Sequence, residues 1–210
     1  VARARGLRVI EDAAHAPGAS VEGRALGAFG DLSCFSFFSN KNLAVGEGGM
    51  VCSNDDDLAA KVRRWRSHAM TSPTLDRHRG RAHSYDVTDL GYNYRMDEIR
   101  AALGRVQLRK LDDGSERRRA LAARYRRSLT ALGRLSVPFE RHPGEPNYHI
   151  FPVLLDEGVD RDSLMSALRA EGVQTSVHYP PVHRFTYYRR RGGAAADRLP
   201  LTEAIGAREL

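Results

Sequence analysis

Residues 32–52 read LSCFSFFSNKNLAVGEGGMVC, two apolar stretches separated by a lysine and a glycine-rich turn. Residues 32–38 are rich in Cys and Phe, which is typical of a buried strand. The segment Gly46-Glu47-Gly48-Gly49 predicts a tight reversal, because glycine tolerates positive φ, and residues 50–52 return as a second strand. Lys41 therefore lies between two predicted strands, with aromatic residues on one side of it and glycines on the other.

Lysine is rare in this chain, because 30 of its 33 basic residues are Arg and only Lys41, Lys61 and Lys110 are Lys. Most lysines are solvated surface residues, so a lysine inside an aromatic, glycine-bounded segment is out of place. An imine with an aldehyde requires a primary amine that can lose its proton, and arginine cannot supply one. Lys41 is therefore a candidate for a covalent bond to an aldehyde.

Further polar groups occur at or near the ends of predicted elements. Residues 7–10 read as a short buried strand that ends at Glu11-Asp12, and ligands of α/β sheets bind beyond the carboxyl ends of such strands. Asp12 could be the anion that keeps a pyridine nitrogen protonated, or it could only cap the following loop. Ser36 could donate a hydroxyl to a phosphate or only satisfy its own backbone, and Asn93 could be only a turn residue that leads a helix.

The rest of the chain predicts helices, one long loop and a second small unit. Helices are expected to run to Trp65 and over 97–111, 117–132 and 161–170, with Asn54 or Asp55 as the first N-cap and Asp160 preceding the last helix. Residues 69–88 read as a long loop of the kind that is functional or mobile. Residues 148–155 and 173–177 read as strands around the last helix, which predicts a small α+β domain.

The composition excludes several classes of protein. Hydrophobic and charged fractions of 41% and 28% are those of a soluble globular protein, and no apolar run approaches the roughly 20 residues of a membrane span. Two cysteines, Cys34 and Cys52, fit a reducing cytoplasm. The net charge of +7 and Arg runs such as 117–119 would allow nucleic-acid binding. The runs are not interleaved with exposed aromatic residues and no nucleic-acid motif accompanies them, so we interpret them as solvated helix faces. We expect no membrane, nucleic-acid or metal partner.

Short motifs follow one another in a fixed order and spacing. They are Glu11-Asp12-Ala13-Ala14-His15, Phe35-Ser36-Phe37 through Lys41-Asn42-Leu43, Gly46-Glu47-Gly48-Gly49-Met50, Gly91-Tyr92-Asn93-Tyr94-Arg95-Met96, Ala101-Ala102-Leu103-Gly104 with Gln107-Leu108, His178-Tyr179-Pro180-Pro181, and Leu199-Pro200 to Glu203. Over essentially the whole chain they resemble the DegT/DnrJ/StrS family of sugar aminotransferases. The resemblance implies a fold-type I architecture, with a large α/β domain built on a mostly parallel sheet and a small C-terminal α+β domain.

The resemblance also implies a role for each motif residue toward pyridoxal 5′-phosphate (PLP). Lys41 would form the internal Schiff base, Asp12 would pair with the pyridine nitrogen, and His15 would lie near the 3-hydroxyl of the cofactor. Ser36 would bind the phosphate. Asn93 would reach the phosphate of the neighbouring subunit's cofactor, so that a homodimer shares its active sites. Relatives that remove a sugar hydroxyl carry His in place of the lysine, so a transaminase is implied.

The substrates implied by the resemblance are an amino-acid donor, expected to be Glu, and a nucleotide-linked keto-sugar used for cell-surface polysaccharides or secondary metabolites. Arg77 and Arg81 in the long loop could meet the phosphates of the nucleotide. His178 and His183 would lie near the sugar, although a structural role for each histidine fits the sequence equally well.

Family members carry a long segment before the first strand seen here, with a phosphate-binding Gly/Ser-Thr turn and an aromatic residue that stacks on the ring. This chain contains neither and opens without a start Met, so we expect the C-terminal part of an enzyme. Residues 1–115 would be the remainder of the large PLP-binding domain, 116–134 a connecting helix and 135–210 the small domain. Two alternatives stay open: a catalytically inactive truncated relic, and a basic nucleic-acid or regulatory binding protein.

Overall fold

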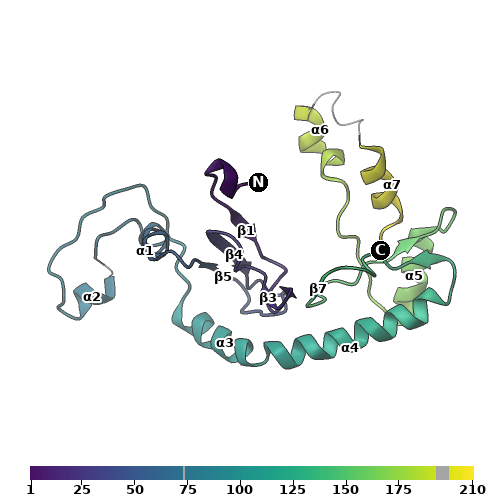
Figure 1. Cartoon of the computed structure of the whole chain (residues 1–210), viewed down its shortest axis with the longest axis horizontal. Coiled ribbons are helices and arrows are strands. Elements are labelled where there is room, and N and C mark those ends of the chain that lie inside the picture. The colour runs from purple at the N-terminus through teal and green to yellow at the C-terminus, as the bar shows by residue number, and fades with distance from the viewer. Residues whose placement is uncertain (73, 193–198) are drawn as a thin grey trace. The chain divides into compact units, whose positions relative to one another are not determined.

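The computed structural model describes residues 1–72, 74–192 and 199–210, and its contacts divide the chain into two units. Unit 1 comprises Val1–Arg119 and Pro143–His149, and unit 2 comprises Ala120–His142 and Ile150–Leu210. Figure 1 labels most of the helices and strands of both units. The segment 143–149 therefore belongs to unit 1 although it follows part of unit 2 in the sequence.

A three-stranded mixed sheet in the order β1-β4-β5 lies at the centre of unit 1. Strand β1 (Ile10–Asp12) runs parallel to β4 (Leu32–Ser36), and β5 (Gly49–Cys52) runs antiparallel to β4. The two strands predicted around Lys41 are thus β4 and β5. The α/β class is confirmed, with one parallel and one antiparallel pair in this sheet, while β1 begins three residues later than the predicted strand.

A second, antiparallel sheet in the order β3-β2-β7 brings distant parts of unit 1 together. Strand β2 (Ser20–Val21) pairs with β3 (Arg24–Ala25) on one side and with β7 (Gly144–Glu145) on the other. Gly144 requires the absence of a side chain, because a Cβ there would lie 2.6 Å from the carbonyl oxygen of Ser20. This close approach fixes residues 144–149 beside the loop that follows β1.

The helices of the first part of the chain are η1 (Arg3–Arg5), α1 (Asp56–Trp65), α2 (Thr74–His78), α3 (Glu98–Arg109) and α4 (Leu111–Thr130). Asp55 caps α1 by accepting a hydrogen bond from the N–H of Leu58 at 3.1 Å, as a side chain at this position is expected to do. Helix α4 starts six residues earlier than predicted. The structure places α2 inside the stretch 69–88, which the sequence predicted as loop throughout.

The hydrophobic core of unit 1 is built around the segment that carries Lys41. Phe37, Leu43, Val45 and Leu111 are all buried and in contact, and the partly buried Phe35 and Met96 pack against them. Three of the four buried members lie within four residues of Lys41, so the position of the lysine depends directly on this core.

Unit 2 combines a two-stranded sheet with helices. Strand β6 (Leu135–Ser136) pairs antiparallel with β8 (Leu154–Leu155), and the helices that follow are α5 (Arg161–Ala170), η2 (Val182–Arg184), α6 (Thr186–Gly192) and α7 (Pro200–Arg208). The bounds predicted for α5 are confirmed. None of the helices in the described part of the chain combines the length and the apolar composition that a membrane span requires.

Both strands predicted for the second unit are wrong over most of their length. Only Leu154–Leu155 of the stretch 148–155 is a strand, because Tyr148 has a φ of +48° and Pro152 has no N–H to donate to a ladder. Residues 173–177 form no strand, since the described residues offer them no paired neighbour. An alternating sequence predicts a strand only where a partner strand exists.

Candidate functional site

Asp12 and Ser36 lie at the same end of two neighbouring parallel strands. Asp12 is the last residue of β1 and is opposite Cys34 of β4, while Ser36 is the last residue of β4. Because side chains alternate along a strand, Asp12, Cys34 and Ser36 share one face of the sheet. Ser33 is fully buried and Phe35 packs on the core, so the opposite face is the covered one. The sheet thus presents a carboxylate and a hydroxyl on its open face.

Lys41 lies in the turn that follows β4. Its backbone N–H donates to the carbonyl oxygen of Phe38 at 2.9 Å, and its side chain is half-buried. At the base of the turn, Phe37 donates to the carbonyl oxygen of Gly48 at 2.8 Å and accepts from the N–H of Val45 at 2.9 Å. Backbone bonds and buried neighbours therefore hold the turn, while the lysine amine remains accessible.

His15 follows β1 and is exposed, and its ring lies against the ring of His149, with 4.3 Å between the centroids and 49° between the planes. Sequence reasoning missed His149, because the alternation of residues 148–155 indicated only a strand. The two imidazoles come from segments far apart in the chain that the pairing of β2 with β7 brings together.

Asn147 is a buried polar residue, 5% exposed, that sequence reasoning also missed. Its side-chain amide donates to the carbonyl oxygens of His15 at 2.8 Å and Pro17 at 2.9 Å. Its own carbonyl oxygen accepts from Nδ2 of Asn42 at 3.1 Å and from Nε of Arg118 at 3.0 Å. The loop after β1 and the turn that carries Lys41 are therefore linked through one residue.

Asn93 lies in a ladder with the residues that end α1. Tyr92 donates to the carbonyl oxygen of Trp65 at 2.6 Å, Tyr94 donates to that of Arg66 at 2.8 Å, and the side chain of Asn93 is exposed. The rings of Tyr92 and Tyr94 stack with centroids 5.2 Å apart. The same motif ends at Met96, which packs on the core around Lys41, so the Asn93 motif and the Lys41 turn are held by one core.

The two arginines predicted to meet phosphates lie in or near α2. The guanidinium of Arg77 lies 3.9 Å from the centre of the Tyr85 ring, and Nη1 of Arg81 lies 3.8 Å from Oδ1 of Asp76. Both groups are thus engaged by neighbours on their own segment.

The two predicted substrate histidines belong to unit 2. Nδ1 of His178 lies 3.1 Å from the hydroxyl of Ser176, and the N–H of His178 donates to the buried carboxylate of Glu209 at 3.2 Å. His183 pairs with Glu203, which also accepts from Nε of Arg184 at 2.6 Å. Hydrogen bonds from Arg184 and then from His183 lower the pKa of Glu203 to about 2.

Glu11, the neighbour of Asp12, has a structural role. Burial alone would raise its pKa, but the backbone N–H groups of Gly30, Gly27 and Phe29 donate to its carboxylate and lower the pKa overall. The donor–acceptor distances are 2.5, 2.9 and 2.6 Å. Of the adjacent carboxylates, Glu11 thus folds the turn 27–30 while Asp12 stays exposed at the strand end.

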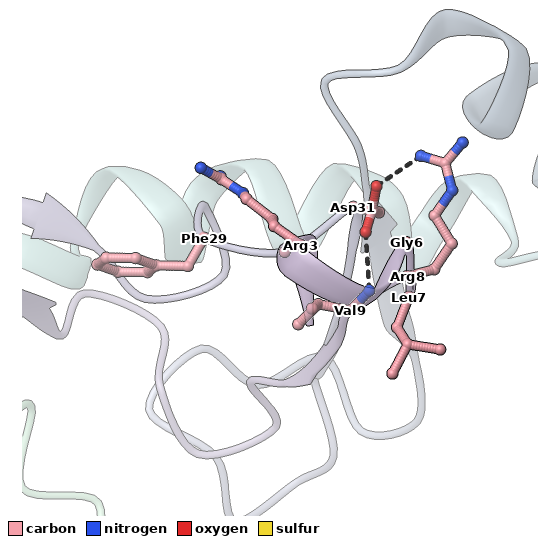
Figure 2. A pocket seen from close by; sticks show the side chains of 8 residues that line it. Arg3, Gly6, Leu7, Arg8, Val9, Phe29 and Asp31 are labelled. Atoms are coloured by element: carbon pink, nitrogen blue, oxygen red, sulfur yellow. Dashed lines mark hydrogen bonds and ion pairs between the residues drawn. The ribbon is translucent and has the colours of Figure 1, made fainter. Parts of the chain in front are cut away.

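A cavity of about 330 Å³ lies at the opposite, amino end of β1 and is lined by residues of 3–9 and 29–31. Figure 2 shows the Asp31 carboxylate there, between Nη1 of Arg8 at 2.6 Å and the N–H of Val9 at 2.7 Å. The hydrogen bonds from Val9 and then from Arg8 lower the pKa of Asp31. The cavity contains none of the residues predicted to act in the site.

The residues at the carboxyl end of β1 and β4 define what this region can bind. The described residues contain no group of three or more His, Cys, Asp or Glu arranged to hold a metal ion. Instead they offer a primary amine on Lys41, a carboxylate on Asp12 and a hydroxyl on Ser36. These groups fit the aldehyde, the protonated ring nitrogen and the phosphate of PLP, respectively.

Comparison with known proteins gives consistent matches. The model of the DegT/DnrJ/EryC1/StrS aminotransferase family matches residues 1–210. The chain is 39% identical, over 198 residues, to the spore coat polysaccharide biosynthesis protein SpsC of Bacillus subtilis (strain 168), covering 92% of this chain and 51% of SpsC.

Two solved structures are similar over 99% of this chain. DesV of S. venezuelae, in complex with a ketimine intermediate, is 34% identical with a TM-score of 0.83, and the match covers 53% of it. DesI, solved in the presence of its TDP-sugar product, is 34% identical with a TM-score of 0.82, and the match covers 50% of it. The chain thus spans about half the length of the relatives it matches.

Proposed function

Because the chain belongs to the DegT/DnrJ/EryC1/StrS aminotransferase family, we propose that it supplies the lysine of a PLP-dependent transfer of an amino group from an amino acid to a nucleotide-linked keto-sugar. The observation that carries the proposal is the position of Lys41, half-buried in a held turn after β4. Asp12 and Ser36 end the two adjacent parallel strands.

Each of these residues has a task that its position allows. Lys41 would hold PLP through its aldehyde carbon, with loss of water, and its amine would be the group placed to take the proton from the donor's Cα. Asp12 would keep the pyridine nitrogen protonated, Ser36 would donate its hydroxyl to the phosphate, and His15 would hold the 3-hydroxyl side of the ring. PLP, when bound, supplies the electron-withdrawing ring that stabilises negative charge at the donor's Cα.

The substrates and the assembly are part of the same proposal. The TDP-sugar product in the DesI structure supports a nucleotide-linked sugar as acceptor, with Arg77, Arg81, His178 and His183 as its contacts and Glu as the donor. Asn93 reaches the cofactor phosphate of a second subunit in a cytoplasmic homodimer. Residues 1–115 form part of the large domain, 116–134 connect, and 135–210 form the small domain, except that 143–149 pack in unit 1.

Covalent trapping tests the proposal directly. The protein is incubated with PLP and reduced with borohydride, and its peptides are analysed by mass spectrometry for a pyridoxyl group. We expect the label on Lys41, no label in Lys41→Ala, and an unchanged label in Lys61→Ala, whose lysine lies exposed on α1. Label only on Lys61 or Lys110, or no label on any lysine, would overturn the proposal.

Asp12→Asn separates binding from catalysis. This variant keeps the size of the side chain but loses the charge that holds the ring nitrogen protonated. We expect it to keep the label on Lys41 and to lose turnover by a factor on the order of 10² to 10³. Full turnover in Asp12→Asn would show that another group balances the charge of the ring.

A further inference from the structure

The side chain of Asn147 makes an unusually complete set of hydrogen bonds for a buried amide. Its two N–H groups donate to the carbonyl oxygens of His15 and Pro17, and its Oδ1 accepts from the N–H of His149 at 3.3 Å. The amide therefore holds the backbones of both histidines whose rings lie in contact. A buried carbonyl left without a hydrogen-bond donor is unfavourable, so the loop after β1 has a strong preference for this position.

The backbone of the same residue holds the Lys41 turn. Nδ2 of Asn42, the residue directly after Lys41, donates to the carbonyl oxygen of Asn147 at 3.1 Å. A continuous connection thus runs from the Lys41 turn through the amide of Asn42 to the backbone of Asn147, and through the amide of Asn147 to His15 and Pro17. The position of one loop reaches the other only if both amides keep their hydrogen bonds, because the two amides follow one another along a single path.

Asn147 is itself held from two sides. The pairing of β7 with β2 fixes Gly144 and Glu145, and Nε of Arg118 on α4 donates to the carbonyl oxygen of Asn147 at 3.0 Å. Arg118 also donates to the hydroxyl of Ser115 at 3.2 Å. A residue fixed in this way can transmit the position of one loop to the other.

We propose that Asn42 and Asn147 are positioning residues, which set the Lys41 turn at a fixed place relative to the Asp12–His15 loop. The inference rests on the proposed function, in which Lys41 and Asp12 act on the same cofactor. Neither amide touches the reacting atoms. Their effect is to keep the amine of Lys41 and the loop after Asp12 in register, and a misplacement of about 1 Å at reacting atoms can cost on the order of 10² in rate.

Three variants test the path: Asn42→Leu, Asn147→Leu and the double variant, with Asn54→Leu as the matched control at an exposed site before α1. Leucine keeps the approximate volume of asparagine but has no donor. We expect each single variant to slow the trapping of PLP on Lys41 and to lower kcat by about 10- to 100-fold. The double variant should lose no more kcat or trapping rate than the slower single variant, because the loss of either hydrogen bond already interrupts the same path.

Hydrogen exchange of the protein without PLP gives a readout that does not depend on activity. In Asn42→Leu, which loses one hydrogen bond, amides of residues 12–18 and of residues 38–45 should both exchange about tenfold faster. In Asn147→Leu, which loses three, both segments should exchange at least as fast. The control Asn54→Leu should leave both segments unchanged.

Some outcomes would overturn the inference. Effects of the single variants that multiply in the double variant would show two independent contacts. Faster exchange confined to the substituted segment, or spread uniformly over unit 1, would show a local or a general loss of stability. If the unsubstituted protein takes no label on Lys41, the proposed function fails, while the exchange measurement still decides whether the two amides connect the loops.

Discussion

Leu43→Ala is expected to lower the free energy of unfolding of unit 1 by about 3 kcal/mol, because Leu43 anchors the turn that carries Lys41. Leu43 is 4% exposed and belongs to a cluster whose other buried members, Phe37, Val45 and Leu111, are 8%, 5% and 8% exposed. Truncation of a buried leucine to alanine costs about 2–5 kcal/mol, from lost transfer energy and from the cavity left behind. We expect a value below the top of this range because the neighbouring Phe35 and Met96 are only partly buried and can shift into the space.

The assay is urea unfolding followed by tryptophan fluorescence. The single tryptophan, Trp65, lies on α1 and therefore reports on unit 1. A loss of about 3 kcal/mol corresponds to roughly a hundredfold change in the ratio of folded to unfolded protein. The control is Ile99→Ala on α3, where the side chain is 84% exposed and the expected change is within about 0.5 kcal/mol. Equal losses in the two variants would refute the view that the core around Lys41 holds its turn.

Three further predictions concern single side chains. Ser33 is fully buried and its hydroxyl has no hydrogen-bond partner in the described part of the chain. Ser33→Ala should therefore leave the urea midpoint unchanged or raise it, and a clear decrease would reveal a hydrogen bond to this hydroxyl. Asp160 accepts hydrogen bonds from two N–H groups in the first turn of α5. Asp160→Ala should therefore lower the free energy of unfolding, followed by circular dichroism, by about 1 kcal/mol. An unchanged free energy would contradict the role of Asp160 as N-cap. The pKa of Glu203 is lowered from 4.5 to about 2 by Arg184 and His183. Because a lowered folded pKa stabilises the protein above the unfolded value, stability should fall as pH drops from about 4.5 to 2. Glu203→Gln should make this fall less steep, while carboxylates such as Asp31 keep their own contribution.

Local causes explain the elements that the sequence predicted well. The cap of α5 by Asp160 and its end before Gly172 depend only on neighbouring residues, and the predicted bounds 161–170 are those of the structure. The turn between β4 and β5 likewise follows from its glycines, since Gly46 has a φ of +92° and a Cβ on Gly49 would lie 2.8 Å from the carbonyl oxygen of Phe35. The predicted strand 173–177 failed because its residues alone could not reveal whether a partner strand is present.

The residues of the candidate site likewise fall into those that local sequence indicates and those that only the tertiary structure reveals. Lys41 could be singled out from the sequence because a lysine is unusual in its aromatic, glycine-bounded setting, and Asp12 became a candidate because it ends a predicted strand. In the structure Asp12 is the last residue of β1, and Lys41 follows β4, the strand paired with β1. Their roles toward PLP remain predictions that labelling of Lys41 can test. His149 could not be recognised, because its contact with His15 arises only from the pairing of β2 with β7.

Asn147 shows why the residues that hold a site are harder to predict than those that perform its chemistry. Its partners Asn42 and His15 are 105 and 132 residues away in the sequence, and no spacing rule connects such positions. The chemistry it requires is nevertheless specific: two N–H donors and one acceptor at the reach of a single methylene, which among side chains only asparagine offers. Aspartate has the same shape but, when ionised, would face the carbonyl oxygens of His15 and Pro17 with a charge and no donor. Asn147→Asp should therefore speed the exchange of both segments as Asn147→Leu does, and exchange as slow as in the unsubstituted protein would mean that the two bonds donated to His15 and Pro17 do not hold the loops.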